Sequence, residues 1–481
     1  MTSPHRENAL PDAVPTAASE RLSGGSVREA GVLSSRYRWV SVGLFLLVML
    51  DAFVALGVTT IMPTVSRELD GAGLYAFAFA GPVAVSVVGM VAAGIWCDRW
   101  NPRSALVISV AIFTAGLTVI ALAPNMVAFV GGRLVHGLAG GAVTVALYVV
   151  VARIYPQTLH AKVFAAFATA WVIPSLIGPV AAGVLAETIG WRWIFLGVVT
   201  LVILAMLIVV PAMRAVRGTA NHSPIGRAEV VRIGLAVVVA AAALVIAVAA
   251  EMRGPIQSIG PIVAAAIVLI ALRPLMPAGT LRARRGLPSV VLLRALLTAT
   301  FLAAEVYVPL LLITHYGASA ALAGLALTAG GLSWSAASWM QGRFPQIGHV
   351  LAARIGATGL TVGVGSLVIA SLMSATPVVV VVIGWTFAGA GIGLIYPRLG
   401  ALALGYSTAD NQGFNSSALT IGEATASALA LASMAVVFSA FGGTDTSTSF
   451  AAVFALAGAL CALGWLCSPR IAARPELTPP L

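Results

Sequence analysis

The sequence is dominated by a succession of long apolar segments, which leave few folds open to it. Runs of about 18 or more apolar residues recur along the 481-residue chain, and each can cross a hydrocarbon layer about 30 Å thick as a helix. Sixty per cent of the residues are hydrophobic and 9% are charged, against roughly 25% charged residues in a soluble domain. No period-two alternation is sustained, which argues against an outer-membrane barrel. We therefore expect an all-α polytopic membrane protein.

The apolar segments form two sets of six, with further candidates between the sets. The first set lies near residues 39–62, 73–96, 104–123, 126–152, 163–184 and 193–212. The second set lies near residues 290–313, 321–341, 352–373, 377–397, 412–439 and 450–467. Between them lie a clear candidate at 233–250 and a weaker one at 257–272, which Gln257 and Pro261 interrupt. We expect about fourteen spans, with twelve as the alternative.

This pattern predicts a domain organisation with two bundles. Six-helix bundles are expected at 39–213 and 287–468, joined by a linker at 214–286 that carries two additional membrane helices. The segment 1–38 is rich in Ala, Ser, Pro and mixed charge and has no apolar core, so we expect a disordered cytoplasmic tail rather than a signal peptide. Residues 469–481 are expected to form a second cytoplasmic tail.

Arginine placement predicts the orientation, because positively charged short loops stay in the cytoplasm. With fourteen spans and the N-terminus inside, only Arg67, Arg192 and Arg253 fall outside, Arg133 lies within a span, and the remaining 23 of 27 basic residues are cytoplasmic. Thirteen spans would move five arginines outside: Arg343, Arg354, Arg398, Arg470 and Arg474. Both termini are therefore expected in the cytoplasm. The single lysine, Lys162, and the heavy use of Ala, Gly, Val and Arg indicate a GC-rich bacterium and hence its inner membrane.

Other classes of protein find little support in the sequence. The net charge of +11 comes from arginines scattered in short loops, whereas a nucleic-acid-binding protein gathers its cations on a soluble face. Cys97, Cys461 and Cys467 lack metal or disulfide spacing. An intramembrane enzyme would need a compact catalytic group, but the histidines are scattered and no Gly-x-Ser-x-Gly or His-x-x-Glu-His motif occurs. We expect a monomer without cofactor or metal, and a transporter-like sensor stays a minor alternative.

The fourth and tenth segments carry similar glycine patterns. The fourth reads Arg133-Leu-Val-His136-Gly137-Leu-Ala-Gly140-Gly141, and the tenth reads Trp385-Thr-Phe-Ala388-Gly389-Ala-Gly391-Ile-Gly393. The pattern favours a parallel duplication with substrate bound between the two halves. Close helix packing is nevertheless the favoured explanation of the glycines themselves.

Three motifs carry a resemblance to the major facilitator superfamily. The loop after the second segment reads Gly94-Ile-Trp-Cys-Asp98-Arg99-Trp-Asn-Pro-Arg103, which is similar to the superfamily's signature Gly-x-x-x-Asp-Arg-x-Gly-Arg-Arg, although Asn101 and Pro102 depart from it. The resemblance implies that Asp98 and the adjacent arginines pair at a helix terminus and hold one arrangement of the halves. A topology-setting role for Arg99 and Arg103 is the alternative.

The second motif begins the fourth segment. Arg133-Leu-Val-His136-Gly137 resembles the Arg-x-x-Gln-Gly motif of the superfamily's proton-coupled antiporters, which implies a role for Arg133 in proton coupling. His136 replaces the usual glutamine and lies on the same helix face as Arg133. A histidine can titrate near neutral pH; a hydrogen-bonded packing role is the alternative.

The third motif lies in the fifth segment. Pro174-Ser-Leu-Ile-Gly178-Pro179-Val-Ala-Ala-Gly183 is similar to the end of the Gly-Pro motif that marks antiporters. Trp191-Arg192-Trp193 follows, as is common in the fourteen-span drug:proton antiporter branch. Proline removes a helical hydrogen bond, and a bend is therefore expected here.

Acidic residues inside spans are candidates for the transport site. Asp51, Glu305 and Glu423 lie well within spans, and an aspartate facing lipid costs roughly 2.5 to 3.5 kcal/mol. The family fold implies that Asp51, Arg133, His136 and Glu305 line one pathway. The alternatives are hydrogen bonds to neighbouring helices, notably between Glu305 and a carbonyl freed by Pro309, and for Glu423 a place on a helix that is not a main cavity helix.

Tryptophans of the second set could form an aromatic wall for a bulky substrate. Trp334, Trp339 and Trp385 are the candidates, with interfacial anchoring as the alternative for Trp339.

Together these features predict a secondary transporter that exports hydrophobic or amphipathic small molecules, such as drugs, by alternating access in exchange for protons. A carboxylate at Asp51 or Glu305 would bind a proton from one side and release it to the other as hydration of the cavity changes. The carboxylates with Arg133 and His136 favour protons over sodium. A proton-coupled uptake symporter of a small metabolite is the alternative in the same fold.

Overall fold

The structure is a computed structural model that describes residues 31–71, 74–213, 225–249, 255–344, 346–373, 376–442 and 446–472. Its described residues form helices, turns and connecting segments, without a strand. The prediction of an all-α chain is confirmed. Most of the two predicted tails and parts of the central linker lie outside the described residues.

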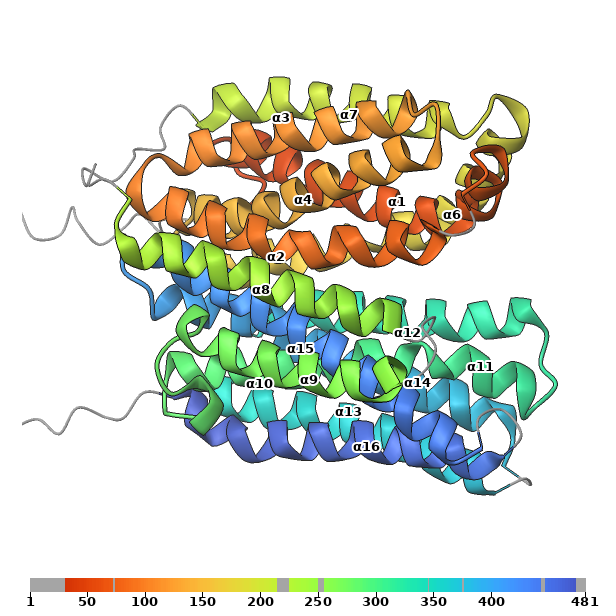
Figure 1. Ribbon diagram of the computed structural model, residues 1–481. Helices are drawn as coiled ribbons and strands as arrows, with labels where there is room; N and C mark the ends of the chain where they lie inside the picture. Colours follow the sequence, from red (N-terminus) through yellow and green to blue (C-terminus); the bar gives the residue numbers. More distant parts are fainter. Residues whose placement is uncertain are drawn as a thin grey trace, which may run out of the picture.

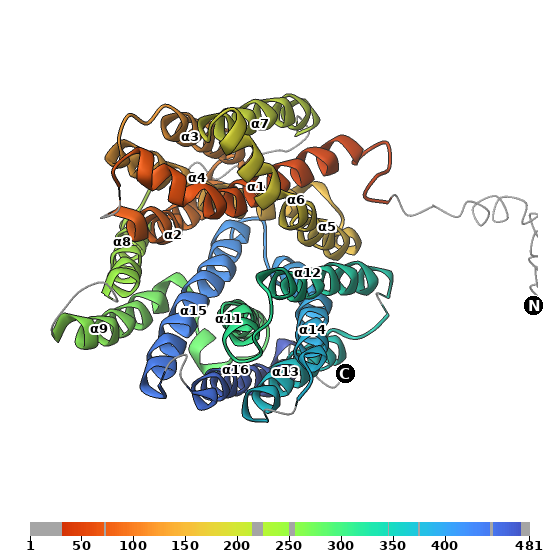
Figure 2. The same ribbon diagram turned by 90° about the vertical axis from the view of Figure 1, so that its right-hand side faces the viewer.

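The helices form two bundles and a central pair. The first bundle contains α1 (Arg38–Glu68), α2 (Tyr75–Arg99), α3 (Pro102–Ala121), α4 (Met126–Ile154), α5 (Gln157–Thr169), α6 (Val172–Thr188) and α7 (Arg192–Ala212). The second contains α10 (Leu287–Glu305), α11 (Tyr307–Thr314), α12 (Ala320–Arg343), α13 (His349–Leu372), α14 (Val378–Gly405), α15 (Gln412–Ala440) and α16 (Ser447–Cys467). The central pair is α8 (Arg227–Ala249) and α9 (Pro255–Leu272), followed by the short 3-10 helices η3 (Arg273–Leu275) and η4 (Thr280–Arg282); a third, η6 (Ser468–Ile471), follows α16. The bundles lie one above the other, with α8 and α9 on one flank (Figures 1 and 2).

The number of spans differs from the prediction of about fourteen. Within the described residues, 12 helical stretches are long and apolar enough to cross a membrane. Of the central pair, α8 meets the criterion through Arg227–Ile246, whereas the described apolar part of α9, Gly260–Leu275, is shorter. Helix α12 is not among the 12, and its serines and Gln341 lower its hydropathy. The count of fourteen is therefore not confirmed.

Two predicted spans are divided by a proline. The fifth span breaks into α5 and α6 at Ala170 and Trp171, before Pro174, and the seventh breaks into α10 and α11 at Val306, before Pro309. A proline has no N–H for the carbonyl four residues earlier and its ring crowds that carbonyl. The helix is thus interrupted just before Pro174, where a bend was expected.

Two other prolines stay inside continuous helices, because a neighbouring helix satisfies the carbonyl that each one frees. Pro82 in α2 frees the carbonyl of Ala78, and Arg133 Nε of α4 donates to that oxygen at 3.2 Å. Pro397 in α14 frees the carbonyl of Gly393, which accepts from Ser338 Oγ of α12 at 2.9 Å. In membrane bundles neighbouring groups commonly satisfy such carbonyls.

The glycines of α4 and α14 allow backbones to touch. A Cβ on Gly137 would lie 2.3 Å from the Pro82 carbonyl oxygen of α2, and one on Gly141 would lie 2.1 Å from that of Ser86. In the second bundle, a Cβ on Gly393 would lie 2.2 Å from the Trp334 carbonyl oxygen of α12. The two similar glycine patterns therefore serve equivalent close packing, of α4 on α2 and of α14 on α12.

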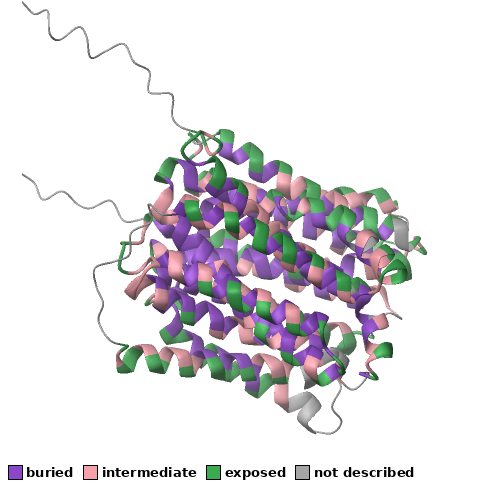
Figure 3. Cartoon of the chain, turned by 90° about the horizontal axis from the view of Figure 1, so that it is seen from above, coloured by how far each residue is buried: buried purple, intermediate pink, exposed green. Residues whose placement is uncertain are grey.

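The outer faces of the bundles are apolar. Large exposed side chains include Trp193, Ile262, Leu325 and Leu466, as expected where lipid is the solvent. Figure 3 shows exposed residues along the outer faces and buried residues between the helices. Charged side chains inside the described bundles include the buried arginines Arg133, Arg294 and Arg398.

Candidate functional site

The two bundles meet at one end of the molecule through Asp98. Its carboxylate accepts hydrogen bonds from the backbone N–H groups of Gly413 at 2.5 Å and Phe414 at 2.8 Å. Both donors belong to the first turn of α15, where backbone N–H groups lack helical partners and the helix dipole attracts an anion. Asp98, the next-to-last residue of α2, thereby joins the first bundle to the second. We call this end the Asp98 end.

Gly94 allows this contact because the backbones of α2 and α15 nearly touch there. A Cβ on Gly94 would lie 2.8 Å from the Gly413 carbonyl oxygen, and one on Gly413 would lie 2.1 Å from the Gly94 carbonyl oxygen. Larger residues at either position would push the helices apart. The pairing of glycines in segments 319 residues apart was not visible in the sequence.

Further contacts between the bundles gather at the Asp98 end. The Arg153 guanidinium donates to the carbonyl oxygen of Ala409, and Gln341 Nε2 lies 3.4 Å from the carbonyl oxygen of Ala161. Arg153 lies in the last turn of α4, and Gln341 lies in the last turn of α12. Ala161 lies near the start of α5, and Ala409 lies in the connection before α15. The structure is therefore closed at this end.

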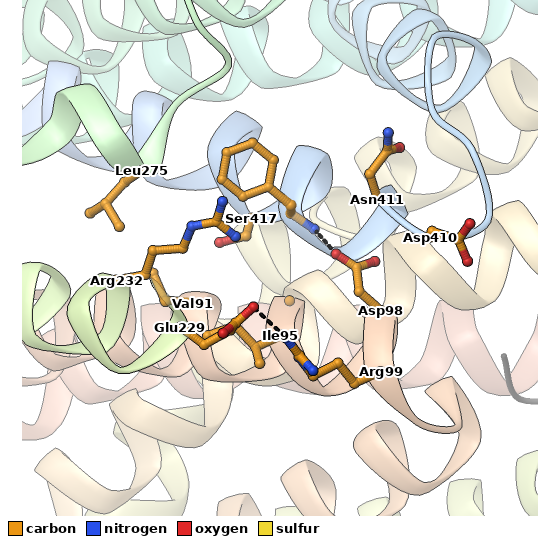
Figure 4. Close-up of a pocket in the computed structure, with 12 residues that line it drawn as sticks. Val91, Ile95, Asp98, Arg99, Glu229, Arg232, Leu275, Asp410, Asn411 and Ser417 are labelled. Carbon is orange, nitrogen blue, oxygen red and sulfur yellow. Dashed lines mark hydrogen bonds and ion pairs between the residues drawn. The ribbon is translucent and has the colours of Figure 1, made fainter. Parts of the chain in front are cut away.

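Helix α8 completes the Asp98 end from the flank. Arg99 Nη2 donates to Glu229 Oε1 at 2.5 Å, and the Arg232 guanidinium lies 4.5 Å from the centre of the Phe414 ring. In Figure 4 the Arg99 and Glu229 side chains point toward each other and are joined by a dashed line. Helix α8 thus contacts α2 through one side chain and α15 through another.

A cavity of about 310 Å³ lies among these groups. Its polar lining includes Asp98, Arg99, Glu229, Arg232, Asp410 and Asn411 (Figure 4). Charges of both signs surround it, so it has no clear preference for an anion or a cation.

Arg103, the last residue of the signature loop, takes no comparable part. Its backbone N–H donates to Asn101 Oδ1 at 2.9 Å, and Asn101 is therefore the N-cap of α3. Pro102 occupies the first turn of α3. Its side chain makes no hydrogen bond or ion pair with the part of the chain that the structure describes. The two departures from the family pattern therefore form a regular helix start.

Asp51 and Arg133 lie near each other inside the first bundle. The Asp51 Oδ1 atom of α1 lies 3.9 Å from the position that a Cβ of Gly140 would take on α4, and the charges of Asp51 and Arg133 act on each other. The two do not form an ion pair within 4.0 Å. Arg133 instead donates to the Ala78 carbonyl of α2.

His136 packs next to this pair without a polar contact. Its ring lies 4.4 Å from that of Phe113 on α3, and both ring nitrogens are buried without a hydrogen-bond partner. The Phe113 ring edge also lies 4.0 Å from the position of a Gly140 Cβ, beside Asp51. Asp51 of α1 and Arg133 and His136 of α4 thus lie near one another, and the role of His136 in proton coupling or in packing stays a prediction.

Glu305 stands apart from that group. It is the last residue of α10, at the break before α11, and its half-buried side chain makes no hydrogen bond or ion pair among the residues described. A single pathway that contains Glu305 and Asp51 stays a prediction.

Glu423 belongs to a buried charge cluster that the sequence reasoning missed. Arg294 Nε of α10 donates to Glu423 Oε2 of α15 at 2.9 Å, and the Tyr396 hydroxyl of α14 donates to Glu423 Oε1 at 3.0 Å. Arg294 Nη2 donates to the hydroxyl of Tyr148, on α4 of the first bundle, at 2.6 Å.

Arg294 and Arg398, which the sequence places on the cytoplasmic side, lie inside helices rather than in loops. Each is buried within a membrane-spanning helix, Arg294 in α10 and Arg398 in α14. Both stand near an end of an apolar run, where hydropathy cannot separate a loop from a span. The position of Arg294 inside the run predicted at 290–313 was the available signal.

The tryptophans form part of the core of the second bundle. The Trp385 ring is fully buried and stacks on Phe301 at 4.5 Å, while Trp334 meets the edge of the same ring at 5.0 Å. Trp339 is 57% exposed and lies under the Arg343 guanidinium, as in the anchoring alternative.

The third motif lines the contact between α6 and α1. Gly178 faces Phe53 and Leu56, and Gly183 faces Thr60, at ordinary contact distances. The side chain of Pro179 lies outside the described residues.

Comparisons with known proteins identify the family. The family model of the Major Facilitator Superfamily matches residues 44–431. A "probable multidrug-efflux transporter" of Mycobacterium tuberculosis, found in two strains, is 30% identical over 404 residues, or 79% of this chain and 82% of that protein. An efflux pump of Gibberella moniliformis is 28% identical over 196 residues, which are 40% of this chain and 35% of the pump.

Solved structures share the fold. The human organic anion transporter is similar with a TM-score of 0.67 at 15% identity, over 90% of this chain and 99% of that one. A proton:xylose symporter gives a TM-score of 0.62 at 15% identity, over 89% of this chain and 94% of that one. A bacterial homologue of the iron transporter ferroportin, in an outward-facing state, gives 0.67 at 12% identity, over 90% and 99%. This chain is a multi-pass membrane transporter of the major facilitator superfamily.

Proposed function

We propose that this protein exports hydrophobic or amphipathic small molecules, such as drugs, in exchange for protons, by alternating access between its two bundles. The contact between Asp98 and the first turn of α15 carries the proposal. It closes one end of the molecule with hydrogen bonds and close backbone packing that can separate without unfolding either bundle. The 30% identical relative, described as a probable multidrug-efflux transporter, supports the export of drugs.

The proposed proton route uses Asp51 and Arg133 in the first bundle, with His136 beside them and Glu305 in the second bundle. Asp51 takes up a proton while water reaches it from outside and releases it when the Asp98 end opens. A membrane potential of 100 mV adds about 2.3 kcal/mol for each proton that moves inward. The gradient is the energy source, without a cofactor.

The proposed location is the inner membrane of a bacterium, with the Asp98 end and both termini in the cytoplasm. The positive-inside rule supports this orientation, since Arg99 and Arg153 lie at the Asp98 end. Small molecules, protons and lipid are the proposed partners, and the protein is proposed to act as a monomer.

Efflux of fluorescent dyes from cells and inverted vesicles tests the proposal. Export predicts dye movement that requires a proton gradient and that Asp51→Asn, Arg133→Ala or Glu305→Gln reduces. If all three variants keep coupled transport, the proposed proton route is wrong.

The alternative is proton-coupled uptake of a small metabolite. A proton:xylose symporter has the same fold, so the architecture accommodates either direction. Accumulation of substrate in cells without efflux would favour uptake.

A further inference from the structure

Arg294 has a guanidinium whose three nitrogens meet three different surroundings. Nε donates to Glu423 at 2.9 Å, Nη2 donates to the Tyr148 hydroxyl at 2.6 Å, and Nη1 is buried without a hydrogen-bond partner. The side chain is 2% exposed. A buried donor of a charged group that lacks an acceptor is costly and calls for an explanation.

Side chains of both bundles contact this guanidinium. Glu423 and Tyr396 both belong to the second bundle. Glu423 accepts from Nε, and the Tyr396 ring covers one face of the guanidinium, with its centre 3.9 Å from the guanidinium carbon. Tyr148 and Phe164, from α4 and α5 of the first bundle, stack on each other at 4.5 Å. The position of a Gly400 Cβ lies 3.2 Å from both Arg294 Nη1 and Phe164 Cδ2. Nη2 therefore contacts the first bundle directly through Tyr148, and Nη1 lies where Gly400 of α14 meets Phe164 of the first bundle.

Opening of the Asp98 end would uncover Nη1 and Nη2. Tyr148 and Phe164 would move away with the first bundle, while Glu423 and Tyr396 would remain in place around Arg294. Nη1 and Nη2 would then face the opened space as a pair of parallel donors. This is the geometry with which arginine binds a carboxylate or a phosphate bidentately.

We propose that Arg294 binds an anionic group of the transported molecule, a carboxylate, sulfonate or phosphate, when the Asp98 end is open, and that Tyr148 takes the place of that group when the end closes. The inference rests on the proposed function and names a substrate class within it. Tyr148 and the anion need the same nitrogen, Nη2, so that they exclude each other. A ligand that binds only one state draws the protein toward that state, and the return of Tyr148 favours release on the opposite side.

Equilibrium binding to the purified full-length protein in lipid nanodiscs tests this site. Fluorescein is the anionic aromatic probe and ethidium the cationic one, each followed by fluorescence anisotropy. Arg294→Gln is expected to weaken fluorescein binding roughly 10-fold to 100-fold, as for the loss of charge-assisted hydrogen bonds, and to leave ethidium binding within about 2-fold. The fluorescein affinity of Arg294→Lys should lie between those of wild type and Arg294→Gln, because lysine keeps the positive charge but lacks the paired N–H donors of the guanidinium.

Two further variants keep the test decisive. Arg294→Gln leaves Glu423 unpaired, which can destabilise the fold, so that Arg294→Gln with Glu423→Gln repeats the measurement without the unpaired carboxylate. Tyr148→Phe should strengthen fluorescein binding, because it removes the competing hydroxyl, whereas a merely structural role for Tyr148 predicts no gain. Arg354→Gln, at an exposed position of α13, is the matched control and should change neither affinity.

The inference is overturned if wild-type protein shows no saturable fluorescein binding, if the double variant binds fluorescein as tightly as wild type, or if both probes weaken equally. Proton-driven ethidium efflux from inverted vesicles reports separately on the proposed function. Fluorescein binding through Arg294 in a protein that fails to export ethidium would refute multidrug export and leave the anion site standing.

Discussion

The Arg133 guanidinium donates to the carbonyl oxygen of Ala78, the acceptor that Pro82 leaves without a helical donor. This contact ties α4 to α2 and fixes the guanidinium in the interior of the first bundle. The same side chain acts electrostatically on Asp51 of α1. Arg133 is thus a structural link between helices as well as a candidate for proton coupling, and the two roles can be separated experimentally.

Replacement of Pro82 should relieve the structural role of Arg133. Pro82→Ala restores an N–H for the Ala78 carbonyl, so that Arg133→Ala should then cost less than in the wild-type background. Loss of a donor to a buried carbonyl costs about 1 to 3 kcal/mol, and most of that cost should disappear in the double variant. Unfolding midpoints in detergent measure the coupling; additive effects would show that the hydrogen bond contributes nothing.

Asp98→Asn should shift the protein away from the state closed at the Asp98 end. The amide keeps the shape but loses the charge that two N–H groups of α15 stabilise. Hydrogen bonds to charged groups contribute about 1.5 to 3 kcal/mol and neutral ones about 0.5 to 1.5, so each of the two bonds should weaken by about 1 kcal/mol. Spin-label distances between the ends of α2 and α15 measure the populations, with Glu187→Gln, at an exposed position of α6, as control. An unchanged distance distribution in Asp98→Asn would contradict this role.

Gly94→Ala should open the same end by steric means. Its Cβ would lie 2.8 Å from the Gly413 carbonyl oxygen, which only separation of α2 and α15 can relieve. Gly131→Ala in α4 adds the same methyl group where nothing lies within 4 Å, and it should leave the population unchanged. Accessibility of a cysteine placed near Asp98 to a water-soluble thiol reagent would rise in the first variant and stay at the parent value in the second.

Helix α8 should stabilise the closed Asp98 end through Glu229. Arg99 and Glu229 are each mostly buried in their ion pair, with 20% and 16% of the side chain exposed, so that the coupling should reach about 1 kcal/mol, the upper end for surface pairs. A double-mutant cycle with Arg99→Gln and Glu229→Gln measures this coupling free energy, with the population of the closed state taken from spin-label distances between the ends of α2 and α15. Zero coupling would mean that α8 is a passive neighbour.

The sequence predicted the helices of this protein better than the contacts between residues on different helices. Apolar length gave the membrane helices, and Pro174 marked a real break, because these are local properties. The α8 contact at Arg99 and the pairing of Arg294 with Glu423 join positions about 130 residues apart, and no helical period reports such pairs. The count of fourteen spans is not confirmed, because among the described residues α12 is not one of the 12 long apolar stretches and the apolar part of α9 is shorter than the others.

Proton movement in reconstituted liposomes tests proton-coupled export most directly. A pH-sensitive dye inside the vesicles reports protons while a drug such as ethidium is added outside, without an imposed gradient. Exchange predicts that inward movement of the drug drives protons out, so that the interior becomes alkaline, and that Asp51→Asn abolishes the signal. Acidification of the interior on drug addition would show symport, and drug movement without any change in internal pH would show that protons are not coupled at all.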